Sequence, residues 1–370
     1  MSNGTSLAGR ILTPAGWITG RLAIGGDGRI AAIEASASAG GQPLEIVPGF
    51  IDLHVHGGDG ADIMQGGDAG ARIARLHART GTTALLATTM TAPVVDIRSA
   101  LRDLAPHIDR RPAGGARILG VHLEGPYINP EKLGAQPAHA RSGSWEEVAD
   151  FHATASLRLV TLAPEFEANL ELIRCLVAAG IHVQLGHSLA TYEQGVAGLA
   201  AGATGFAHLF NAMSELHHRE PGLVGAALAH AEFAELIPDL LHVHPGAIHA
   251  ALRAIPRLYC VTDATAATGR PDGDYMLGSQ PVRKCLGGVR LADGTLAGST
   301  LTMGQGLHNL LGLGLELAEA SWRLSRYPAE FLGIVDRGTL AVGHHADIVV
   351  LDADRHVRQV YVEGENIPCP

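Results

Sequence analysis

The chain has 370 residues, of which 46% are hydrophobic and 17% charged, and its formal net charge at pH 7 is −10. This composition allows a large buried core, and the acidic balance argues against a nucleic-acid partner or a polybasic membrane contact. An anionic small molecule is not excluded, because it needs only a local positive patch. The four cysteines are scattered and no segment is apolar for long enough to span a bilayer, so we expect a reduced cytoplasmic protein without a disulfide framework.

The two ends of the chain share a β-rich texture. Residues 1 to about 48 contain short alternating runs separated by Asp-Gly and Pro turns, and residues 346–352 and 358–362 are further strand candidates. We therefore predict a small β-sandwich domain built from residues 1–48 together with 335–370. It would flank a central domain of residues 49–334.

In the central region, apolar runs alternate with Ala/Leu-rich stretches of helical spacing. Strands that alternate with helices imply parallel strands joined by crossovers. Eight such runs occur, at 50–56, 83–88, 118–123, 157–162, 182–186, 205–208, 235–242 and 258–262. Eight βα units over about 250 residues are what a TIM (β/α)8 barrel requires. An open doubly wound α/β sheet is disfavoured, because no Gly-x-Gly-x-x-Gly turn follows the first strand.

The first predicted strand ends in Asp52-Leu53-His54-Val55-His56-Gly57. Side chains two residues apart on a strand face the same side, so His54 and His56 would point together. Two converging imidazoles make half of a metal site. A lone His-x-His is more often two unrelated polar residues, so the remaining strand ends decide its meaning.

In a TIM barrel the chemistry lies at the C-terminal ends of the strands. Most of the predicted strand ends in this chain carry an imidazole or a carboxylate. In chain order the residues are His54 and His56, Thr88, Glu124, Glu165, His187, His208, His242 and Asp263. Ordinary loop polarity would favour Lys, Asp and Ser over His, so we interpret this set as metal-ligand chemistry.

Nitrogen and oxygen are the only ligand atoms in the candidate metal set. Its members are His54, His56, Glu124, His187, His208 and Asp263. Such donors suit Zn²⁺, Fe²⁺, Mn²⁺ or Co²⁺ better than Ca²⁺ or Mg²⁺. Six ligands exceed what one tetrahedral ion needs, so either two ions share the site, bridged by Glu124, or one ion is bound and the other groups handle substrate. Asp263 could take a proton from water and pass it to a leaving amine, and its structural alternative is a helix N-cap.

Longer motifs surround these residues and extend over nearly the whole chain. They are 48–57, 122–129, 163–165, 185–188, 208–213, 219–222, 261–264, 297–303 and 343–347. On these motifs the chain resembles the N-acetylglucosamine-6-phosphate deacetylases of the amidohydrolase superfamily. His-Leu-Glu-Gly-Pro at 122–126 and His-Leu-Phe-Asn-Ala-Met at 208–213 are the most specific of them.

The resemblance implies metal-dependent hydrolysis of N-acetyl-D-glucosamine 6-phosphate by a homodimer that holds one or two divalent ions per subunit, zinc foremost. Glu124, His187 and His208 would hold the principal ion. His54 and His56 would offer a second position that some relatives lack, and Asp263 would be the general base and acid. The expected substrate contacts are Gln136, Asn211, Ala212, Arg219, His242 and Leu301, with Arg219 reaching the phosphate in a neighbouring subunit.

Two segments depart from the family pattern. Residues 238–241 lack the glycine of the usual Ala-Asp-Gly-x segment, which is expected to put bulk near the sugar, and Met303 is followed by glycine where relatives have an acidic residue. N-acetylgalactosamine 6-phosphate or another N-acyl substrate therefore stays open as an alternative. A non-catalytic metal-binding barrel is a more distant one. Four further histidines are expected to be solvated loop residues, namely His217, His218, His344 and His345.

Overall fold

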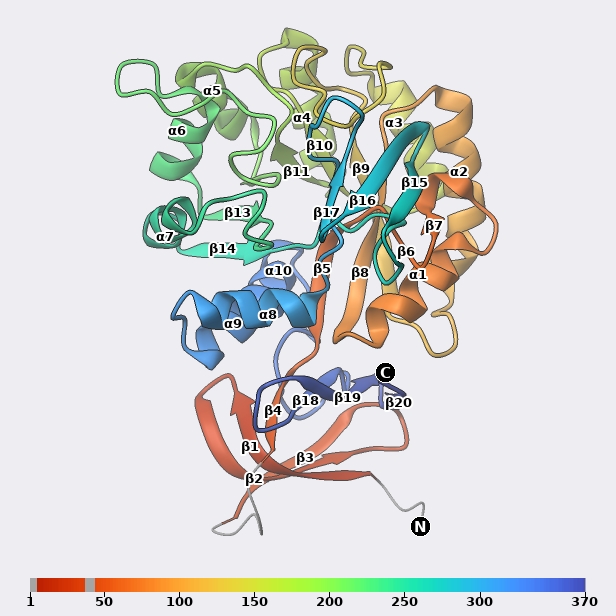
Figure 1. The fold of residues 1–370 in the computed structure, drawn as a ribbon, viewed down its shortest axis with the longest axis vertical. Coiled ribbons are helices and arrows are strands. Elements are labelled where there is room, and N and C mark those ends of the chain that lie inside the picture. Colours follow the sequence, from red (N-terminus) through yellow and green to blue (C-terminus); the bar gives the residue numbers. More distant parts are fainter. Residues whose placement is uncertain (1–4, 37–43, 370) are drawn as a thin grey trace.

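The computed structural model describes residues 5–36 and 44–369. Figure 1 shows a large domain of strands and helices above a small domain of strands, which is built from segments near both ends of the chain. In the described part of the chain, no helix combines the length and the apolar character needed to cross a lipid bilayer.

Eight parallel strands form the centre of the large domain. They are β5 (Phe50–Val55), β8 (Thr82–Thr89), β9 (Arg117–Glu124), β10 (Leu157–Leu162), β11 (His182–Leu185), β12 (Gly205–Phe206), β13 (Phe233–Leu236) and β14 (Arg257–Cys260). Six of them form one sheet in the order β12-β11-β10-β9-β8-β5, and β13 pairs with β14. A parallel bridge between Val55 and Ala264 closes the ring on one side, and a hydrogen bond from Leu209 N to Glu235 O links β12 to β13 on the other. The predicted TIM barrel is confirmed.

One predicted strand is wrong in its bounds. The run expected at 235–242 ends at Leu236 in the structure, so His242 lies on a loop. Pro238 cannot donate a backbone hydrogen bond to a neighbouring strand, and Leu240 adopts a left-handed backbone with φ of 64°. Both features end the strand early.

Helices surround the barrel in the alternating order that the sequence predicts. They are α1 (Ala69–Ala78), α2 (Val94–Asp109), α3 (Trp145–Thr154), α4 (Glu167–Ala178), α5 (Tyr192–Ala201), α6 (Gly222–His230) and α7 (Pro245–Ala254), followed by α8 (Met303–Gly312), α9 (Leu317–Leu324) and α10 (Arg326–Phe331). Phe331 of α10 packs against His182, Phe233 and Tyr259, of which the first two begin their strands. The N-terminal end of the barrel is thereby filled, so the chemistry is left to the C-terminal end.

Short antiparallel elements border the C-terminal end. After β14 comes a three-stranded sheet of β15 (Gly273–Leu277), β16 (Gln280–Cys285) and β17 (Gly288–Arg290). After β5 come β6 (Gly57–Gly58), β7 (Ala61–Asp62) and the short helix η1 (Ile63–Gln65). These segments make part of the rim of the barrel mouth (Figure 1).

The small domain joins both ends of the chain in one sheet. Its strands are β1 (Ser6–Thr13), β2 (Gly16–Ile24), β3 (Ile30–Ala35), β4 (Glu45–Pro48), β18 (Ile348–Leu351), β19 (Val357–Val362) and β20 (Glu365–Ile367). In space they lie in the order β20-β19-β18-β4-β1-β2-β3. Hydrogen bonds therefore join all seven strands into one continuous sheet, where the sequence predicted a sandwich. Parts of the predicted domain, residues 1–4, 37–43 and 370, lie outside the described residues.

Glu363, between β19 and β20, ties the small domain to the barrel. Its carboxylate accepts hydrogen bonds from Arg117 at 2.8 and 2.9 Å and from Arg111 at 3.2 Å, and it also pairs with Arg337. Burial alone would raise the pKa of Glu363, but Arg117 and Arg337 outweigh it and lower the pKa to about 2. The ionised carboxylate therefore stabilises the docking of the two domains.

Replacing Glu363 by glutamine should lower the free energy of unfolding by roughly 2 kcal/mol at neutral pH, because three guanidinium groups lose a partly buried counter-charge. The pKa of an unperturbed glutamate is 4.5. The contribution is thus fully present above about pH 4.5 and is lost as the pH falls towards about 2. Urea unfolding of both proteins across this range measures it. Glu365→Gln, which changes a more exposed partner of Arg111, is the matched control, and equal stability of Glu363→Gln and wild type at neutral pH would contradict the assignment.

Candidate active site

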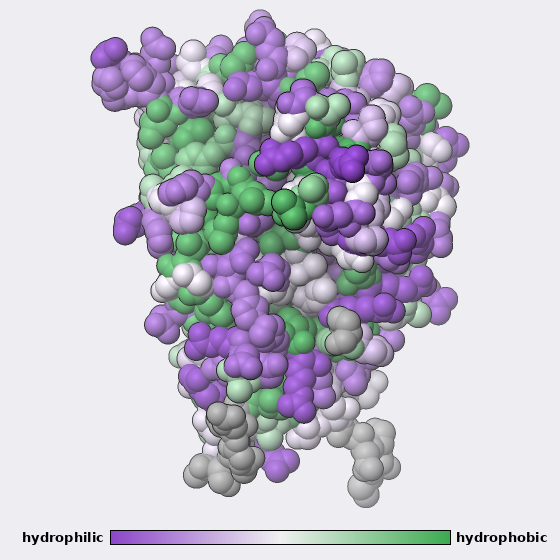
Figure 2. Space-filling view, viewed as in Figure 1, coloured by the Kyte–Doolittle hydropathy of each residue, from purple (hydrophilic) through white to green (hydrophobic). Residues whose placement is uncertain are grey.

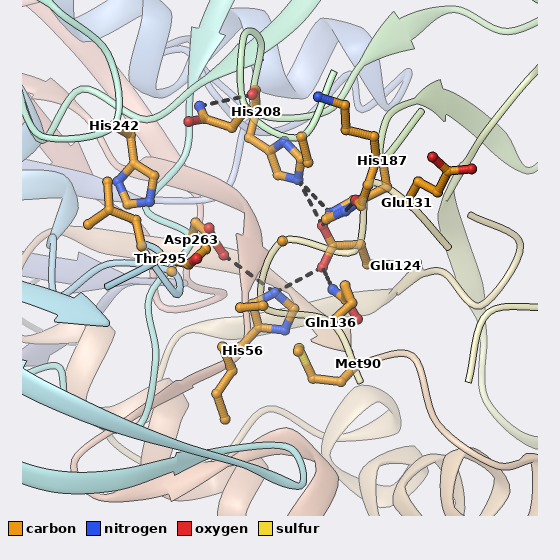
Figure 3. A pocket seen from close by; sticks show the side chains of 18 residues that line it. His56, Met90, Glu124, Glu131, Gln136, His187, His208, His242, Asp263 and Thr295 are labelled. Carbon is orange, nitrogen blue, oxygen red and sulfur yellow. Dashed lines mark hydrogen bonds and ion pairs between the residues drawn. The ribbon is translucent and has the colours of Figure 1, made fainter. Parts of the chain in front are cut away.

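A cavity of about 290 Å³ opens at the C-terminal ends of the strands. Figure 3 shows acidic and imidazole side chains converging there from opposite walls. Among the residues predicted from the sequence, those that line it are His56, Glu124, Gln136, His187, His208, Asn211, Ala212, His242 and Asp263. The barrel therefore brings together side chains that lie up to about two hundred residues apart in the chain, as the strand-end argument expects.

One group of donors consists of Glu124, His187 and His208. The Nε2 atoms of both histidines lie 3.0 Å from Glu124 Oε1 and 3.1 Å from each other. Glu124 ends β9, His187 follows β11 and His208 follows β12, so three strands of one sheet supply the cluster. All three side chains are buried.

A second group consists of His54, His56 and Asp263. The two Nε2 atoms are 3.2 Å apart, as expected for residues i and i+2 of one strand. Asp263 Oδ1 lies 3.4 Å from His56 Nε2 and 3.7 Å from His54 Nε2. Glu124 lies between the groups, with Oε1 at 3.3 Å from His54 Nε2 and Oε2 at 3.1 Å from His56 Nε2.

Backbone conformation sets three of these residues apart. His187, His208 and Asp263 have φ values of 48°, 24° and 52°, in a region that side chains with a Cβ seldom occupy. Each such residue costs on the order of 1–3 kcal/mol and persists only where its surroundings enforce it. The sharp turn directly after the strand holds each side chain over the barrel axis.

All four histidines direct Nε2 to the centre of the site. Behind His54, Nδ1 meets Glu235 Oε2 at 3.0 Å, and behind His187, Nδ1 meets the carbonyl oxygen of Lys132 at 2.9 Å. The Nδ1 atoms of the other two site histidines, His56 and His208, are buried and have no hydrogen-bond partner among the described residues. The shared orientation leaves the Nε2 lone pairs free for a common ligand.

Charges in this buried site shift the pKa values of its groups. Burial alone would lower the pKa values of His54 and His56, but Glu124 and a second carboxylate beside each ring outweigh it. The pKa of His56 rises to about 9 and that of His54 rises well above 6.5. Burial alone would raise the pKa of Glu124, but the histidines hold it well below its usual range. The ionised carboxylates of Glu124 and Asp263 thus require positive charge at this point.

A divalent cation fits this donor set. Each of the four imidazole Nε2 atoms lies 3.0–3.3 Å from an oxygen of Glu124, two of them also lie 3.4–3.7 Å from Asp263, and both carboxylates are buried. Isolated buried carboxylates cost several kcal/mol each, which a cation offsets. Two groups that share Glu124 can accommodate either one ion or two.

Four of the six residues predicted to contact substrate line the cavity. Gln136 donates to Glu124 Oε2 and accepts from Thr91 N at 2.7 Å, so it braces the shared carboxylate as well as lining the cavity. Asn211 donates to His208 O at 3.1 Å. His242 Nδ1 lies 2.6 Å from Asp239 Oδ2; burial would lower its pKa, but this carboxylate outweighs burial and raises it.

Three predicted site residues do not line the cavity. His54 lies behind His56, completely buried. Arg219 is exposed on the loop before α6, where its Nη1 contacts His218 Nε2 at 2.7 Å. Leu301 is buried in the barrel core with Ile51 and Leu53 and does not line the cavity, so its substrate contact stays a prediction.

The segment 238–241, which differs from the family pattern, does not fill the cavity. Leu240 takes the left-handed backbone that glycine would favour, and its side chain is 40% exposed at the surface. Neither Leu240 nor Leu241 lines the cavity. The bulk of both leucines thus lies outside the described lining of this cavity.

Of the four histidines expected on solvated loops, only His217 and His218 are exposed. His344 and His345 are half-buried in the small domain. His344 Nδ1 lies 3.2 Å from Thr339 Oγ1, and His345 Nε2 lies 3.2 Å from Arg29 Nη2.

Sequence reasoning missed several residues of the wall. They are Met90, Glu131, Lys132, Gly134, Ala135, Leu277, Thr295, Leu296 and Gly298. Lys132 is the one lysine or arginine in the described cavity lining. Its place four residues before Gln136, together with the need for a local positive patch in an acidic protein, could have indicated it.

Comparison with known proteins adds to this geometry. The model of the amidohydrolase family, which is metal-dependent, matches residues 46–367. An N-acetylglucosamine-6-phosphate deacetylase from Vibrio furnissii is 42% identical over 330 residues, covering 87% of this chain and 82% of its own. An N-acetylgalactosamine-6-phosphate deacetylase from Escherichia coli O157:H7 is 41% identical over 368 residues, covering 97% of each chain. The structure of a mutant N-acetyl-D-glucosamine-6-phosphate deacetylase from Mycobacterium smegmatis, in complex with N-acetyl-D-glucosamine-6-phosphate, matches with a TM-score of 0.92 at 34% identity, covering 98% of this chain and 99% of that one.

Proposed function

Because the chain belongs to the amidohydrolase family, we propose that it is a metal-dependent deacetylase that hydrolyses N-acetyl-D-glucosamine 6-phosphate to D-glucosamine 6-phosphate and acetate. Asp263 carries the proposal, because its carboxylate faces a cavity whose opposite wall holds the Glu124, His187 and His208 cluster. Such an enzyme serves amino-sugar breakdown and recycling. We place it in the cytoplasm, where phosphorylated sugars occur and where its four free cysteines stay reduced.

One or two divalent ions per subunit, zinc foremost and iron, cobalt or manganese next, are the proposed cofactors. Glu124, His187 and His208 would hold the principal ion, and His54, His56 and Asp263 would hold the second with Glu124 shared. When bound, the metal polarises the acyl carbonyl and lowers the pKa of an attacking water.

Asp263 has the proposed role of proton carrier. Burial alone would raise its pKa, but the hydrogen bond from His56 and the charge of His54 outweigh burial and lower it, so the carboxylate is ionised at neutral pH. It can accept a proton from water and return it to the amine nitrogen as the amide bond breaks. Protonated His242 can donate from Nε2 to the acyl oxygen, because Asp239 accepts from Nδ1 and raises the pKa of the ring. Acetate and the free amine are the products.

The substrate phosphate would be held by cations and by polar groups at the rim. Lys132, Asn211 and Ala212 line that part of the cavity. Arg219 stands on an exposed loop away from its own cavity, which fits a role in the site of a neighbouring subunit.

A homodimer is therefore part of the proposal, and surface chemistry supports it. Figure 2 shows hydrophobic side chains gathered near the middle of the face in view, around β16 and β17. Leu286 is 91% exposed and Leu241 is 49% exposed, and both line a groove of about 700 Å³ there. Exposed apolar patches of this kind commonly mark interfaces.

Replacing Arg219 by alanine should raise the KM for the phosphorylated sugar about 10- to 100-fold with little change in kcat, because a charge-assisted contact contributes about 1.5–3 kcal/mol to binding. Steady-state kinetics measure the change. His218→Ala, next to Arg219 on the same loop, is the control and should behave like wild type. An unchanged KM in Arg219→Ala would contradict the phosphate role.

N-acetylgalactosamine 6-phosphate is the second candidate substrate. The relative named for it is 41% identical to this chain and covers 97% of it. The two sugars differ in the configuration of one hydroxyl group, so their discrimination depends on a few polar contacts.

Acetate release from three sugars tests the proposed function. Metal-loaded protein is supplied with N-acetylglucosamine 6-phosphate, its galactosamine epimer and unphosphorylated N-acetylglucosamine. We expect the highest kcat/KM for the first and a strong dependence on the phosphate. Preference for the epimer would instead establish the second candidate, and no release from any of the three would refute both.

A further inference from the structure

We propose that Glu235 is a positioning residue that orients His54 for the second metal ion. The inference rests on the proposed metal-dependent function, and it concerns a residue that neither lines the cavity nor belongs to the donor set. Glu235 lies in β13, on the inner side of the barrel, and is completely buried. A buried carboxylate in a strand that is otherwise apolar needs a specific reason to be there.

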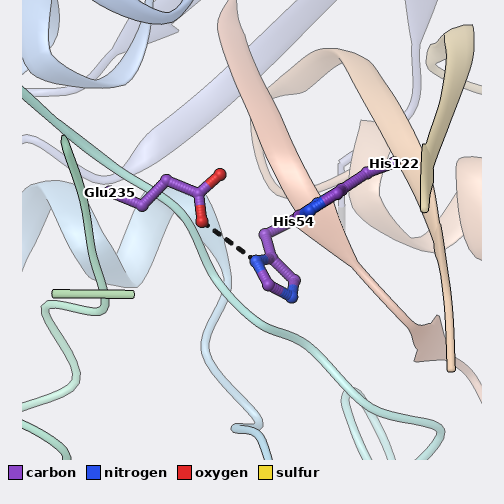
Figure 4. A group of neighbouring side chains, drawn as sticks. All are labelled: His54, His122 and Glu235. Atoms are coloured by element: carbon purple, nitrogen blue, oxygen red, sulfur yellow. Dashed lines mark hydrogen bonds and ion pairs between the residues drawn. The ribbon is translucent and has the colours of Figure 1, made fainter. Parts of the chain in front are cut away.

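Three donors converge on this carboxylate. His54 Nδ1 lies 3.0 Å from Oε2, and the backbone N–H of His208 lies 3.3 Å from the same oxygen. Tyr259 donates to Oε1 at 3.4 Å, while its own hydroxyl oxygen accepts from Gln184. Figure 4 shows the carboxylate aimed at one nitrogen of the His54 ring. The hydrogen bond to Glu235 thus fixes the His54 ring on the side that faces away from the metal site.

The contact decides which nitrogen of His54 is available to a metal ion. The Glu235 carboxylate accepts the hydrogen bond from Nδ1, so Nε2 is the nitrogen that can bind the ion. That Nε2 faces His56 Nε2 at 3.2 Å and Glu124 Oε1 at 3.3 Å. Carboxylates behind metal-binding histidines act in this way, and their loss typically weakens metal binding 10- to 100-fold.

His122 lies next to this pair but does not compete for the role. Its ring is 4.5 Å from that of His54, and the three side chains form a cluster of potential ligands. Nδ1 of His122 donates to the carbonyl oxygen of Leu53 at 3.1 Å, and Nε2 lies 2.7 Å from Thr161 Oγ1. Both ring nitrogens are therefore occupied, so the cluster is a brace for His54 and not a separate metal site.

Glu235 contacts an imidazole ring on one side of the donor set only. In the principal cluster, the His187 ring is held by the carbonyl oxygen of Lys132, and His208 contacts Glu235 through its backbone N–H and not through its ring. A residue that supports His54 should therefore affect the second ion more than the first.

Metal stoichiometry tests the proposal without use of turnover. Metal-depleted protein is titrated with Co²⁺, the ions bound per chain are counted by elemental analysis, and the visible absorption of each site is followed. Wild type should bind two ions. Glu235→Leu, which removes the acceptor at similar volume, should keep one ion and bind the second at least about 10-fold more weakly. Glu235→Gln, which can still accept from Nδ1, should restore the second ion.

Tyr259→Phe is the matched control, since it removes a neighbour of Glu235 but leaves His54 supported, and it should bind two ions. If Glu235→Leu does not fold, Glu235→Asp replaces it, because a carboxylate drawn back by one methylene should also weaken the second ion. Unchanged binding of the second ion in the folded variant, or a wild type that binds one ion only, would overturn the proposal. Two bound ions in a wild type without acetate release would refute the proposed function instead.

Discussion

Replacement of Asp263 by asparagine should leave a folded protein that holds metal but turns over about 10²- to 10⁴-fold more slowly. Asparagine keeps the shape of the side chain and one oxygen, so the neighbouring histidines stay in place. It cannot accept a proton from water, so the proton has no carrier between water and the leaving amine. Acetate release together with metal analysis of the same sample measures both parts of the expectation.

Asp354→Asn is the control for that experiment, because Asp354 is exposed in the small domain and does not line the cavity. It should retain wild-type turnover. Normal activity of Asp263→Asn with metal bound would remove Asp263 from the mechanism and leave the reaction without an assigned proton carrier.

Replacement of Glu124 by alanine should abolish binding of both ions and reduce turnover by roughly 10³-fold or more, because metal polarisation contributes several kcal/mol to the transition state. Glu124 contacts imidazoles of both donor groups through its carboxylate, with one oxygen near His187 and His208 and the other near His56. Elemental analysis after dialysis gives the metal content, and circular dichroism verifies the fold.

Glu124→Gln is a graded version of the same change. It retains one neutral oxygen, so it should bind metal more weakly than wild type but more tightly than Glu124→Ala. Glu167→Ala, an exposed acid at the start of α4, is the control. Full metal content in Glu124→Ala would show that the two groups bind metal independently of the shared carboxylate.

Strand ends made the site predictable from the sequence. The alternation of apolar runs and helical stretches gives parallel strands, and parallel strands in a barrel bring their C-terminal ends to one mouth. His56, Glu124, His187, His208 and Asp263 then have to meet, whatever the exact bounds of each strand. The early end of β13 at Leu236 did not remove His242 from the cavity, because the loop that follows leads back to the mouth.

Other features depend on packing that local patterns do not encode. The strand runs of the small domain are the same whether they pair in one sheet or in two, and the pairing of β4 with both β1 and β18 joins them into one. Leu301 belongs to a recognisable motif, but the direction of its side chain is set by the barrel core around Ile51.

Glu235 shows what the sequence indicated without revealing its role. A single acid in the apolar run Phe-Ala-Glu-Leu-Ile at 233–237 is unusual and predicts a buried partner. Its partner becomes clear only when the barrel is closed, because Glu235 of β13 then meets a side chain of β5 across the barrel interior. The residue that it meets, His54, lies 181 positions away in the chain.

The central claim is that the converging donors bind metal and that hydrolysis depends on it. The most direct measurement is a titration of metal-depleted protein with Zn²⁺ while acetate release from N-acetylglucosamine 6-phosphate is followed. We predict no turnover at the start, a rise with added metal and a plateau by about two equivalents per chain. Full turnover of the metal-depleted protein, unaffected by added Zn²⁺, would contradict the account.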